Sequence, residues 1–272
     1  MMHRERPFDA VAKDWLKRQF ERGCSHREIA DILFQQGFSV ETVRKQMGDK
    51  YPVEMEKSTA RLEMPPILRD PPKNLRRVDS PKLDLFVLED FMGEKMCDQV
   101  AGLIRHHLKP SPLAGETHDK EYRTSRTCFL SDLRTPVVEE VNQRICKVMG
   151  INPEYGERIQ VQHYEVGQQF KKHHDFFTPG SAYEQNGPEF GNRTWSFMVY
   201  LNDGMEGGGT RFHAINQTFA PRKGRALFWA NLYMDRRPNQ DTLHSGEPVT
   251  AGHKIIITKW FREYGAGKMY LE

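Results

Sequence analysis

Apolar residues recur at helical spacing in the first part of the chain and predict three short helices. The first covers residues 8–21. The second follows Ser25, a good N-cap residue, and ends at Gly37, and the third runs over residues 40–47. Three short helices can bury one shared apolar face, so we expect a small helical domain over residues 1–50.

The pattern of apolar residues changes at residue 51 and again at residue 81. Residues 51–80 have no periodicity and contain two Pro-Pro pairs, which disfavour helix and favour extended chain, so we expect a linker. Residues 81–265 combine two helical stretches, 93–108 and 135–149, with short alternating stretches that are separated by Gly- and Pro-rich turns. Such an order favours a mainly β barrel or sandwich with flanking helices. The expected strands are 83–87, 158–166, 194–201, 210–213, 218–220, 225–229 and 254–261.

Composition narrows the class of protein. With 272 residues, 38% of them hydrophobic, the chain can form one sizeable core and a small accessory unit. The net charge of +3 gives no argument for a nucleic-acid or membrane partner. We find no apolar run of about 18 residues that would span a bilayer, no signal-peptide pattern and no CxxC pair among the four cysteines. We therefore expect a cytoplasmic protein with free thiols.

Three residues in the β region have the chemistry of a metal site. His173 and Asp175 are two positions apart, so in a strand their side chains point to the same face. His244, in the segment DTLHSGEPV, offers a third ligand. Two imidazoles and one carboxylate on one side of a metal form the facial triad of non-haem Fe(II) oxygenases, which leaves positions open for cosubstrate and dioxygen.

The same residues admit other interpretations. A His-x-Asp pair also occurs by chance, and the neighbouring His174 could replace His173 as the ligand. Zinc accepts the same two histidines and carboxylate. Lys254 favours the oxygenase, because it begins the strand KIIITKWF and can return to the same cavity as His244. A buried ammonium needs an anion, which a dicarboxylic cosubstrate would supply, whereas an ordinary strand-end lysine would lie in solvent.

Together these segments resemble the prolyl 4-hydroxylase family of Fe(II)- and 2-oxoglutarate-dependent dioxygenases. The resemblance covers about residues 83–265 and rests on motifs in the family's order, namely HYEVGQQFKKHHD, RTWSFMVYLND, EGGGTRF, PRKGRALFW and HSGEPVTAGHKIIITKW. It implies a double-stranded β-helix, or jelly roll, preceded here by the small helical N-terminal domain. It also implies Fe(II) as the metal and 2-oxoglutarate as cosubstrate, and it admits ascorbate as a further cofactor.

The resemblance implies a role for each site residue. Iron binds His173, Asp175 and His244, and the cosubstrate binds Lys254, Tyr164 and Thr258. The segment YRTSRT resembles an Arg-x-Ser element of the family's substrate-side loop. The residues that the resemblance places at the substrate are Arg123, Ser125, Arg193 and Trp260. Each of the two arginines could equally be an exposed surface residue.

Three positions depart from the family pattern. Phe170 stands where members often have a tyrosine that helps to seat the substrate, which puts the usual pose of a peptidyl proline in doubt. Glu247 replaces a common cysteine, and Gly209 replaces an acidic residue. The Gly- and Pro-rich loops 109–122 and 177–192 are candidates for a lid over the site, or for plain surface connections.

The resemblance implies hydroxylation of an unactivated C–H bond, most often C4 of a prolyl residue in a peptide or protein. A hydroxylase of a free amino acid or small metabolite is the alternative. Asp175 disfavours a halogenase, which lacks this carboxylate, and Lys254 disfavours a nucleic-acid demethylase, which uses arginine there. A third hypothesis makes the N-terminal helices a partner-binding module, with the barrel as a sensor.

Overall fold

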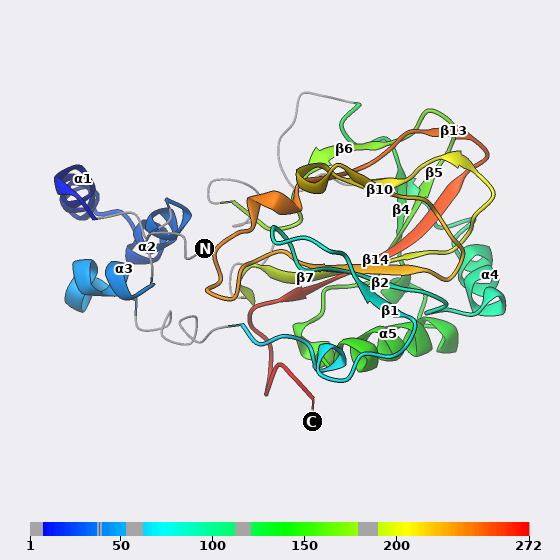
Figure 1. Ribbon diagram of the computed structural model, residues 1–272, viewed down its shortest axis with the longest axis horizontal. Helices are drawn as coiled ribbons and strands as arrows, with labels where there is room; N and C mark the ends of the chain where they lie inside the picture. Colours follow the sequence, from blue (N-terminus) through cyan, green and yellow to red (C-terminus); the bar gives the residue numbers. More distant parts are fainter. Residues whose placement is uncertain are drawn as a thin grey trace. The chain divides into compact units, whose positions relative to one another are not determined.

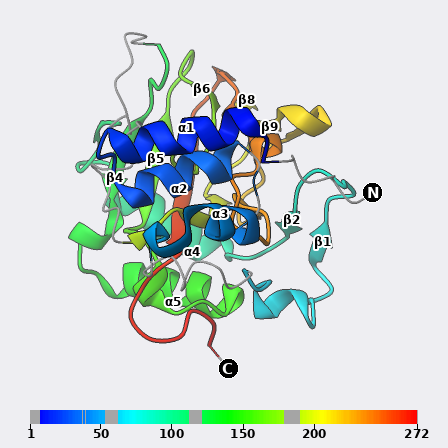
Figure 2. The same ribbon diagram turned by 90° about the vertical axis from the view of Figure 1, so that its left-hand side faces the viewer.

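The computed structural model describes residues 8–36, 38, 40–52, 62–111, 121–178 and 190–271, which form two compact units. The smaller unit contains the predicted helices, here α1 (Ala10–Glu21), α2 (His26–Gln35) and α3 (Val40–Met47), followed by the 3-10 turn η1 (Gly48–Lys50). The three helices gather around a core of their own (Figure 2). Its buried apolar residues are Ala12, Leu16, Ile29, Ala30, Leu33, Phe38, Val43, Met47 and Tyr51.

The larger unit is mainly β (Figure 1). Its strands are β1 (Leu75–Arg77), β2 (Leu85–Leu88), β3 (Lys109–Pro110), β4 (Arg126–Phe129), β5 (Gln160–Tyr164), β6 (Phe170–His173), β7 (Arg193–Tyr200), β8 (Glu206–Gly207), β9 (Thr210–Phe212), β10 (Gln217–Phe219), β11 (Ala226–Ala230), β12 (His244–Gly246), β13 (Val249–Ala251) and β14 (Lys254–Arg262). Its helices and 3-10 turns are η3 (Pro66–Leu68), α4 (Glu94–Leu103), η4 (Leu130–Asp132), α5 (Pro136–Met149), η5 (Pro153–Tyr155), η7 (His213–Ile215) and η8 (Gln240–Thr242).

Two antiparallel sheets form the body of this unit. The larger has the order β1-β2-β11-β7-β14-β5-β4-β3, and the smaller has the order β10-β9-β12-β6, with β13 and β8 as a separate pair. In Figures 1 and 2, α5 lies on the opposite side of the large sheet from β6. Two facing sheets with helices on one outer side agree with the jelly-roll-like architecture that we expected.

The alternation of side chains along the central strands explains this layering. In β7, Trp195, Phe197 and Val199 pack into the core that contains α4 and α5. Met198 and Tyr200 instead pack with residues of the small sheet, such as Phe212. Because β7 and β14 are buried along their whole length, both faces of each strand contribute to a core.

Several local predictions need correction. The stretch 51–80, expected to be irregular, contains η3 and β1, since its Pro-Pro pairs end at residue 72 and leave Leu75–Arg77 free to pair with β2. Helix α4 ends at Leu103 rather than at residue 108, because the chain must turn back into β3. Helix α5 begins at Pro136 and not at residue 135, because Thr135 occupies its N-cap position, where its side chain makes no capping hydrogen bond.

One further expectation, the free cysteines, is confirmed, and others lie outside the described residues. All four cysteines are free. Among the helices that the structure describes, none combines the length and the apolar character needed to cross a membrane. The greater part of both proposed lid loops, residues 112–120 and 179–189, lies outside the described residues.

Candidate active site

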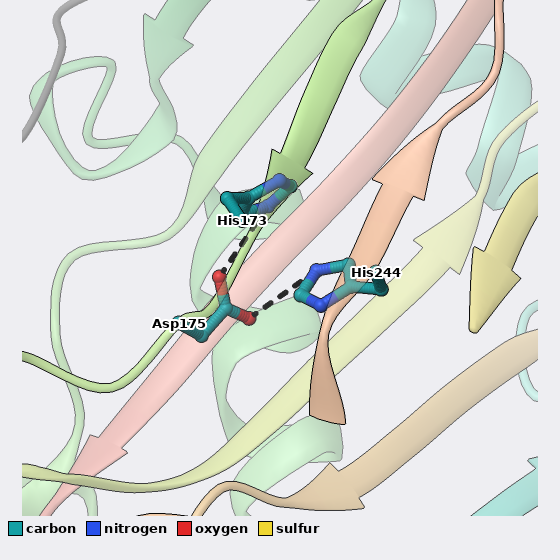
Figure 3. Close-up of side chains that lie close together, drawn as sticks. All are labelled: His173, Asp175 and His244. Carbon is teal, nitrogen blue, oxygen red and sulfur yellow. Dashed lines mark ion pairs between the residues drawn. The ribbon is translucent and has the colours of Figure 1, made fainter. Parts of the chain in front are cut away.

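The three predicted metal ligands come together at one end of the small sheet. His173 ends β6 and His244 begins β12, and the two residues are direct cross-strand partners. Asp175 follows two residues after His173, and its carboxylate lies 3.8 Å from His173 Nε2 and 4.0 Å from His244 Nε2. One ligand atom from each residue lies within 4.8 Å of the other two, and all three side chains point toward a common space (Figure 3).

Both imidazoles are held in the tautomer that a metal needs. His173 Nδ1 lies 2.8 Å from the carbonyl of Lys171, and His244 Nδ1 lies 2.9 Å from the carbonyl of Thr242. A carbonyl only accepts, so each Nδ1 donates its hydrogen and each Nε2 turns its lone pair toward Asp175. Burial and the neighbouring His244 lower the pKa of His173 well below its ordinary value, which keeps that ring neutral. This donor set fits a divalent metal ion.

Asp175 is held by residues of β7. Ser196 Oγ donates to Asp175 Oδ2 at 2.5 Å, and Asn231 Nδ2 donates to the same hydroxyl at 2.9 Å. Burial alone would raise the pKa of Asp175, but His244, His173, Arg193 and the hydrogen bond from Ser196 lower it to about 2. The carboxylate is therefore ionised, as a metal ligand must be.

His174 is turned away from this cluster. Its Nε2 lies 3.0 Å from the carbonyl of Gln240, and its ring stacks on Phe176 with centroids 4.6 Å apart. The prediction that His173, not His174, shares a side with Asp175 agrees with this geometry. His173 and Asp175 do not lie in one strand as assumed, however, because β6 ends at His173 and Asp175 lies in the bend that follows.

A cavity adjoins the three ligands, and its lining encloses about 440 Å³ including its opening to solvent. Among the described residues, those that line it are Arg123, Gln162, Tyr164, Phe170, His173, Asp175, Met198, Thr210, Trp229, His244, Gly246, Lys254, Ile256, Thr258 and Trp260. The cavity therefore contains all three ligands and the predicted cosubstrate residues Tyr164, Lys254 and Thr258. Alternation along β14 explains why Lys254, Thr258 and Trp260 share it.

Lys254 is the buried cation of this cavity. It is only 1% exposed, and burial lowers the pKa of its ammonium to about 7, with Glu247 acting in the opposite direction. Its cross-strand partner on β5 is Tyr164, and Nζ lies 4.2 Å from the centre of that ring. Thr258 donates to Gln162 Oε1 at 2.9 Å nearby. A buried ammonium beside an open cavity suits an anionic ligand.

The predicted substrate residues divide into two groups. Arg123 and Trp260 line the cavity, and the Arg123 guanidinium lies 4.8 Å from the centre of the Phe170 ring. Phe170 itself stacks on His173 with centroids 3.5 Å apart. Ser125 is not among the described residues that line the cavity; it is 2% exposed, and its hydroxyl lies 2.7 Å from Ser111 Oγ.

Arg193 belongs to the second group, since it is also absent from the described lining. Its Nε and Nη2 donate to the two carboxylate oxygens of Glu157, each at 2.7 Å, and its Nη1 donates to the Asp175 carbonyl at 3.3 Å. The guanidinium also lies 3.9 Å from the centre of the Trp260 ring. Arg193 thus holds Glu157 with its fork and the main chain of Asp175 with its remaining nitrogen, and its role at the substrate stays a prediction.

The sequence analysis did not single out Ser196, Asn231, Glu157 or Trp229. Ser196 carried a usable signal, because it is a small polar residue in the buried part of the strand and has the same parity as Met198, which lines the cavity. Glu157 and Asn231 gave none, since their partners are distant in sequence. Trp229 Nε1 and Trp260 Nε1 are buried, without a hydrogen-bond partner among the described residues, which leaves two donors at the cavity wall.

Comparison with known proteins agrees with this geometry. Residues 159–262 match the model of the 2OG-Fe(II) oxygenase superfamily, whose name states its metal and cosubstrate. Prolyl 4-hydroxylase subunit alpha-1 from Bos taurus is 31% identical over 205 residues, which are 74% of this chain. The chain spans only 38% of the length of that curated relative.

Solved structures share the fold. A viral collagen prolyl hydroxylase from Paramecium Bursaria Chlorella virus-1, in complex with 2OG, superposes with a TM-score of 0.51 at 22% identity, over 70% of this chain and 96% of that one. A Trichoplax adhaerens prolyl hydroxylase bound to a hypoxia inducible factor peptide fragment also gives 0.51, at 15% identity, over 77% and 90%. The chain belongs to the 2OG-Fe(II) oxygenase superfamily and is similar to the prolyl 4-hydroxylases within it.

Proposed function

We propose that this protein is an Fe(II)- and 2-oxoglutarate-dependent hydroxylase that acts on C4 of a prolyl residue in a peptide or protein. One observation supports it above all others, namely that the ligand set of His173, Asp175 and His244 shares a cavity with the buried ammonium of Lys254. Neither zinc binding nor a structural metal would call for that buried cation.

The residues in and around the cavity have separate roles in metal binding and cosubstrate binding. His173, Asp175 and His244 hold the metal, Ser196 keeps the Asp175 carboxylate in place, and Arg193 holds the main-chain carbonyl of Asp175. Lys254 neutralises the distal carboxylate of 2-oxoglutarate, with Tyr164 and Thr258 beside it. Bound iron and 2-oxoglutarate supply the oxidising power for hydroxylation of a C–H bond, with release of succinate and CO₂.

The opposite side of the cavity receives the substrate. Arg123, Phe170 and Trp260 line it, and Arg123 carries the positive charge there. The Phe170 ring covers one face of His173 and excludes water from it, but it lacks the hydroxyl that a tyrosine would offer. A charged guanidinium at this wall also suits the carboxylate of a free amino acid, which is the alternative substrate.

Turnover of 2-oxoglutarate to succinate separates the two substrates. We expect proline-containing peptides to stimulate succinate formation and to gain one oxygen atom by mass spectrometry. Stimulation by free amino acids alone would replace the peptide assignment with the small-molecule one. The variant Arg123→Gln serves as the control for binding at this site. It keeps a polar side chain but should reduce the stimulation of succinate formation by either kind of substrate.

The N-terminal helices are proposed as a recruitment module for substrate or partner, with domain limits of 1–50, 51–80 for the linker and 81–265 for the dioxygenase. Their separate core supports this proposal. A chain that lacks residues 1–50 should still turn over a short peptide but should lose a partner that co-purifies with the full chain. A truncated chain that fails to fold would assign the helices a bracing role instead.

A further inference from the structure

Strand β14 buries a second lysine on the face opposite Lys254. Lys259 lies on the same side of the strand as Ile255, Ile257 and Phe261, which belong to the core beneath α4 and α5. It is 3% exposed, and its Nζ donates to the main-chain carbonyl of Glu157 at 3.0 Å. A neutral carbonyl satisfies one of the three ammonium hydrogens, and Nζ lies 5.5 Å from the centre of the Phe261 ring, so the buried charge is compensated only in part.

The Lys259 side chain lines a cavity that is separate from the catalytic one. Its lining encloses about 1070 Å³ including the opening to solvent, and none of the described residues that line it lines the catalytic cavity. The lining combines apolar residues, among them Val138 and Ile159, with polar ones from the start of α5. The space is large enough for a small organic molecule.

The charges around this cavity favour an anion. Lys259, Arg134 and Arg158 line it together with two carboxylates, Glu139 and Glu157, and Arg158 is paired with Asp132 outside the lining. The Glu157 carboxylate is already held by two arginines on its far side, Arg193 and Arg262. Burial raises the pKa of Glu157, but the two arginines lower it overall, so this carboxylate is ionised and its charge is shared among Arg193, Arg262 and Lys259.

Two further features indicate a ligand. Gly156 leaves room for the ammonium, because a Cβ at that position would collide with Lys259 Nζ and Cε. Thr135 Oγ1, at the N-terminus of α5, is buried and has no hydrogen-bond partner among the described residues. A hydroxyl and an ammonium at the start of a 14-residue helix are groups that bind an oxyanion.

We propose that this cavity binds a small organic anion, with its carboxylate or phosphate at Lys259 and Thr135 and an apolar body against Val138 and Ile159. The site is independent of the function proposed above. The oxyanion can be a carboxylate or a phosphate. Benzoate and phenyl phosphate serve as the two probes, because they share a ring and differ in the anion. Benzamide has the shape of benzoate without its charge and is the matched neutral control.

Binding to the full chain is measured by isothermal titration calorimetry. We expect saturable binding of benzoate or phenyl phosphate and at least about tenfold weaker binding of benzamide. Lys259→Met should weaken binding of the anion by about tenfold or more, whereas Lys223→Met, at a lysine that is paired with Asp98 outside both cavities, should change it by less than about twofold. Absence of saturable anion binding, equal binding of benzamide, or an equal loss of affinity in Lys259→Met and Lys223→Met would overturn the proposal.

A second variant keeps the test decisive if Lys259→Met does not fold. Arg134 has a φ of 45°, in the left-handed region that glycine adopts without strain. Arg134→Gly should therefore keep or raise the melting temperature while it removes a positive charge from the cavity rim. We expect anion affinity to fall by about threefold or more, and an unchanged affinity in this variant would contradict the proposed site.

Discussion

Ser196 donates a 2.5 Å hydrogen bond to Asp175 from the centre of β7, so the sheet that forms the core also orients the carboxylate at the proposed metal site. Asn231 donates to the same hydroxyl and fixes its direction. The Ser196 hydroxyl thus has its hydrogen committed to Asp175 Oδ2, which leaves Oδ1 as the oxygen that faces His173. The position of this ligand depends on residues outside the metal-binding motif.

Replacement of Ser196 by alanine should therefore weaken metal binding. We expect an Fe(II) affinity about 10- to 100-fold lower, because the carboxylate loses the partner that orients it. Anaerobic titration with Fe(II) measures the change. Thr194→Val is the matched control, since Thr194 is equally buried on β7 but donates to the Phe261 carbonyl. Equal loss of Fe(II) affinity in both variants would contradict a specific role of the Ser196 hydrogen bond, because the loss of any buried hydroxyl on β7 would then weaken metal binding.

Replacement of Arg193 distinguishes support of Asp175 from contact with substrate. Arg193→Met leaves Glu157 paired with Arg262 alone, and we expect a loss of about 3 kcal/mol in the free energy of unfolding. Glu157→Gln should lower stability similarly, and the double variant should lose less than the sum of the two. Chemical denaturation measures all three. A raised KM for peptide at unchanged stability would instead restore Arg193 to the substrate groove.

The low pKa of Lys254 predicts a pH-dependent cosubstrate affinity. Burial places this pKa at about 7, far below the ordinary 10.5, so above pH 7 the Lys254 ammonium loses its proton in the free protein. A bound dicarboxylate favours the charged ammonium, and binding above pH 7 must therefore take up a proton. We expect the affinity for 2-oxoglutarate to be highest below pH 7 and to fall by up to about tenfold per pH unit above it.

Calorimetry in two buffers of different ionisation enthalpy measures this proton uptake directly. It should approach one proton per site at pH 8, be small at pH 6 and vanish in Lys254→Met. An affinity that does not change with pH, with no proton uptake, would remove Lys254 from the cosubstrate site. The folded state itself should become more stable from about pH 7 to 10.5, because the unfolded chain binds more protons there.

Local patterns explain why much of the molecule could be predicted. Helical periodicity gave α3 with its observed bounds, and alternation placed β7, β11 and β14 within one or two residues. The parity of side chains brought Lys254 to the same cavity as His173 and Asp175. Each of these predictions depends on residues that are close in sequence.

What the sequence could not show depends on residues that are distant from one another along the chain. Glu157, 36 positions before Arg193, occupies the fork of that predicted substrate arginine. Ser125, another predicted substrate residue, is 2% exposed and lies against Ser111. Strand β1 was missed because it is short and mostly exposed, and it becomes a strand only by pairing with β2. No local pattern specifies such partners.

Anaerobic Fe(II) binding by four alanine variants tests the central claim most directly. The account predicts one iron per chain in the unmodified protein and in His174→Ala, whose imidazole faces Gln240. It predicts loss of that iron in His173→Ala, Asp175→Ala and His244→Ala, each with its fold intact by circular dichroism. Retention of iron in His173→Ala together with its loss in His174→Ala would contradict the account.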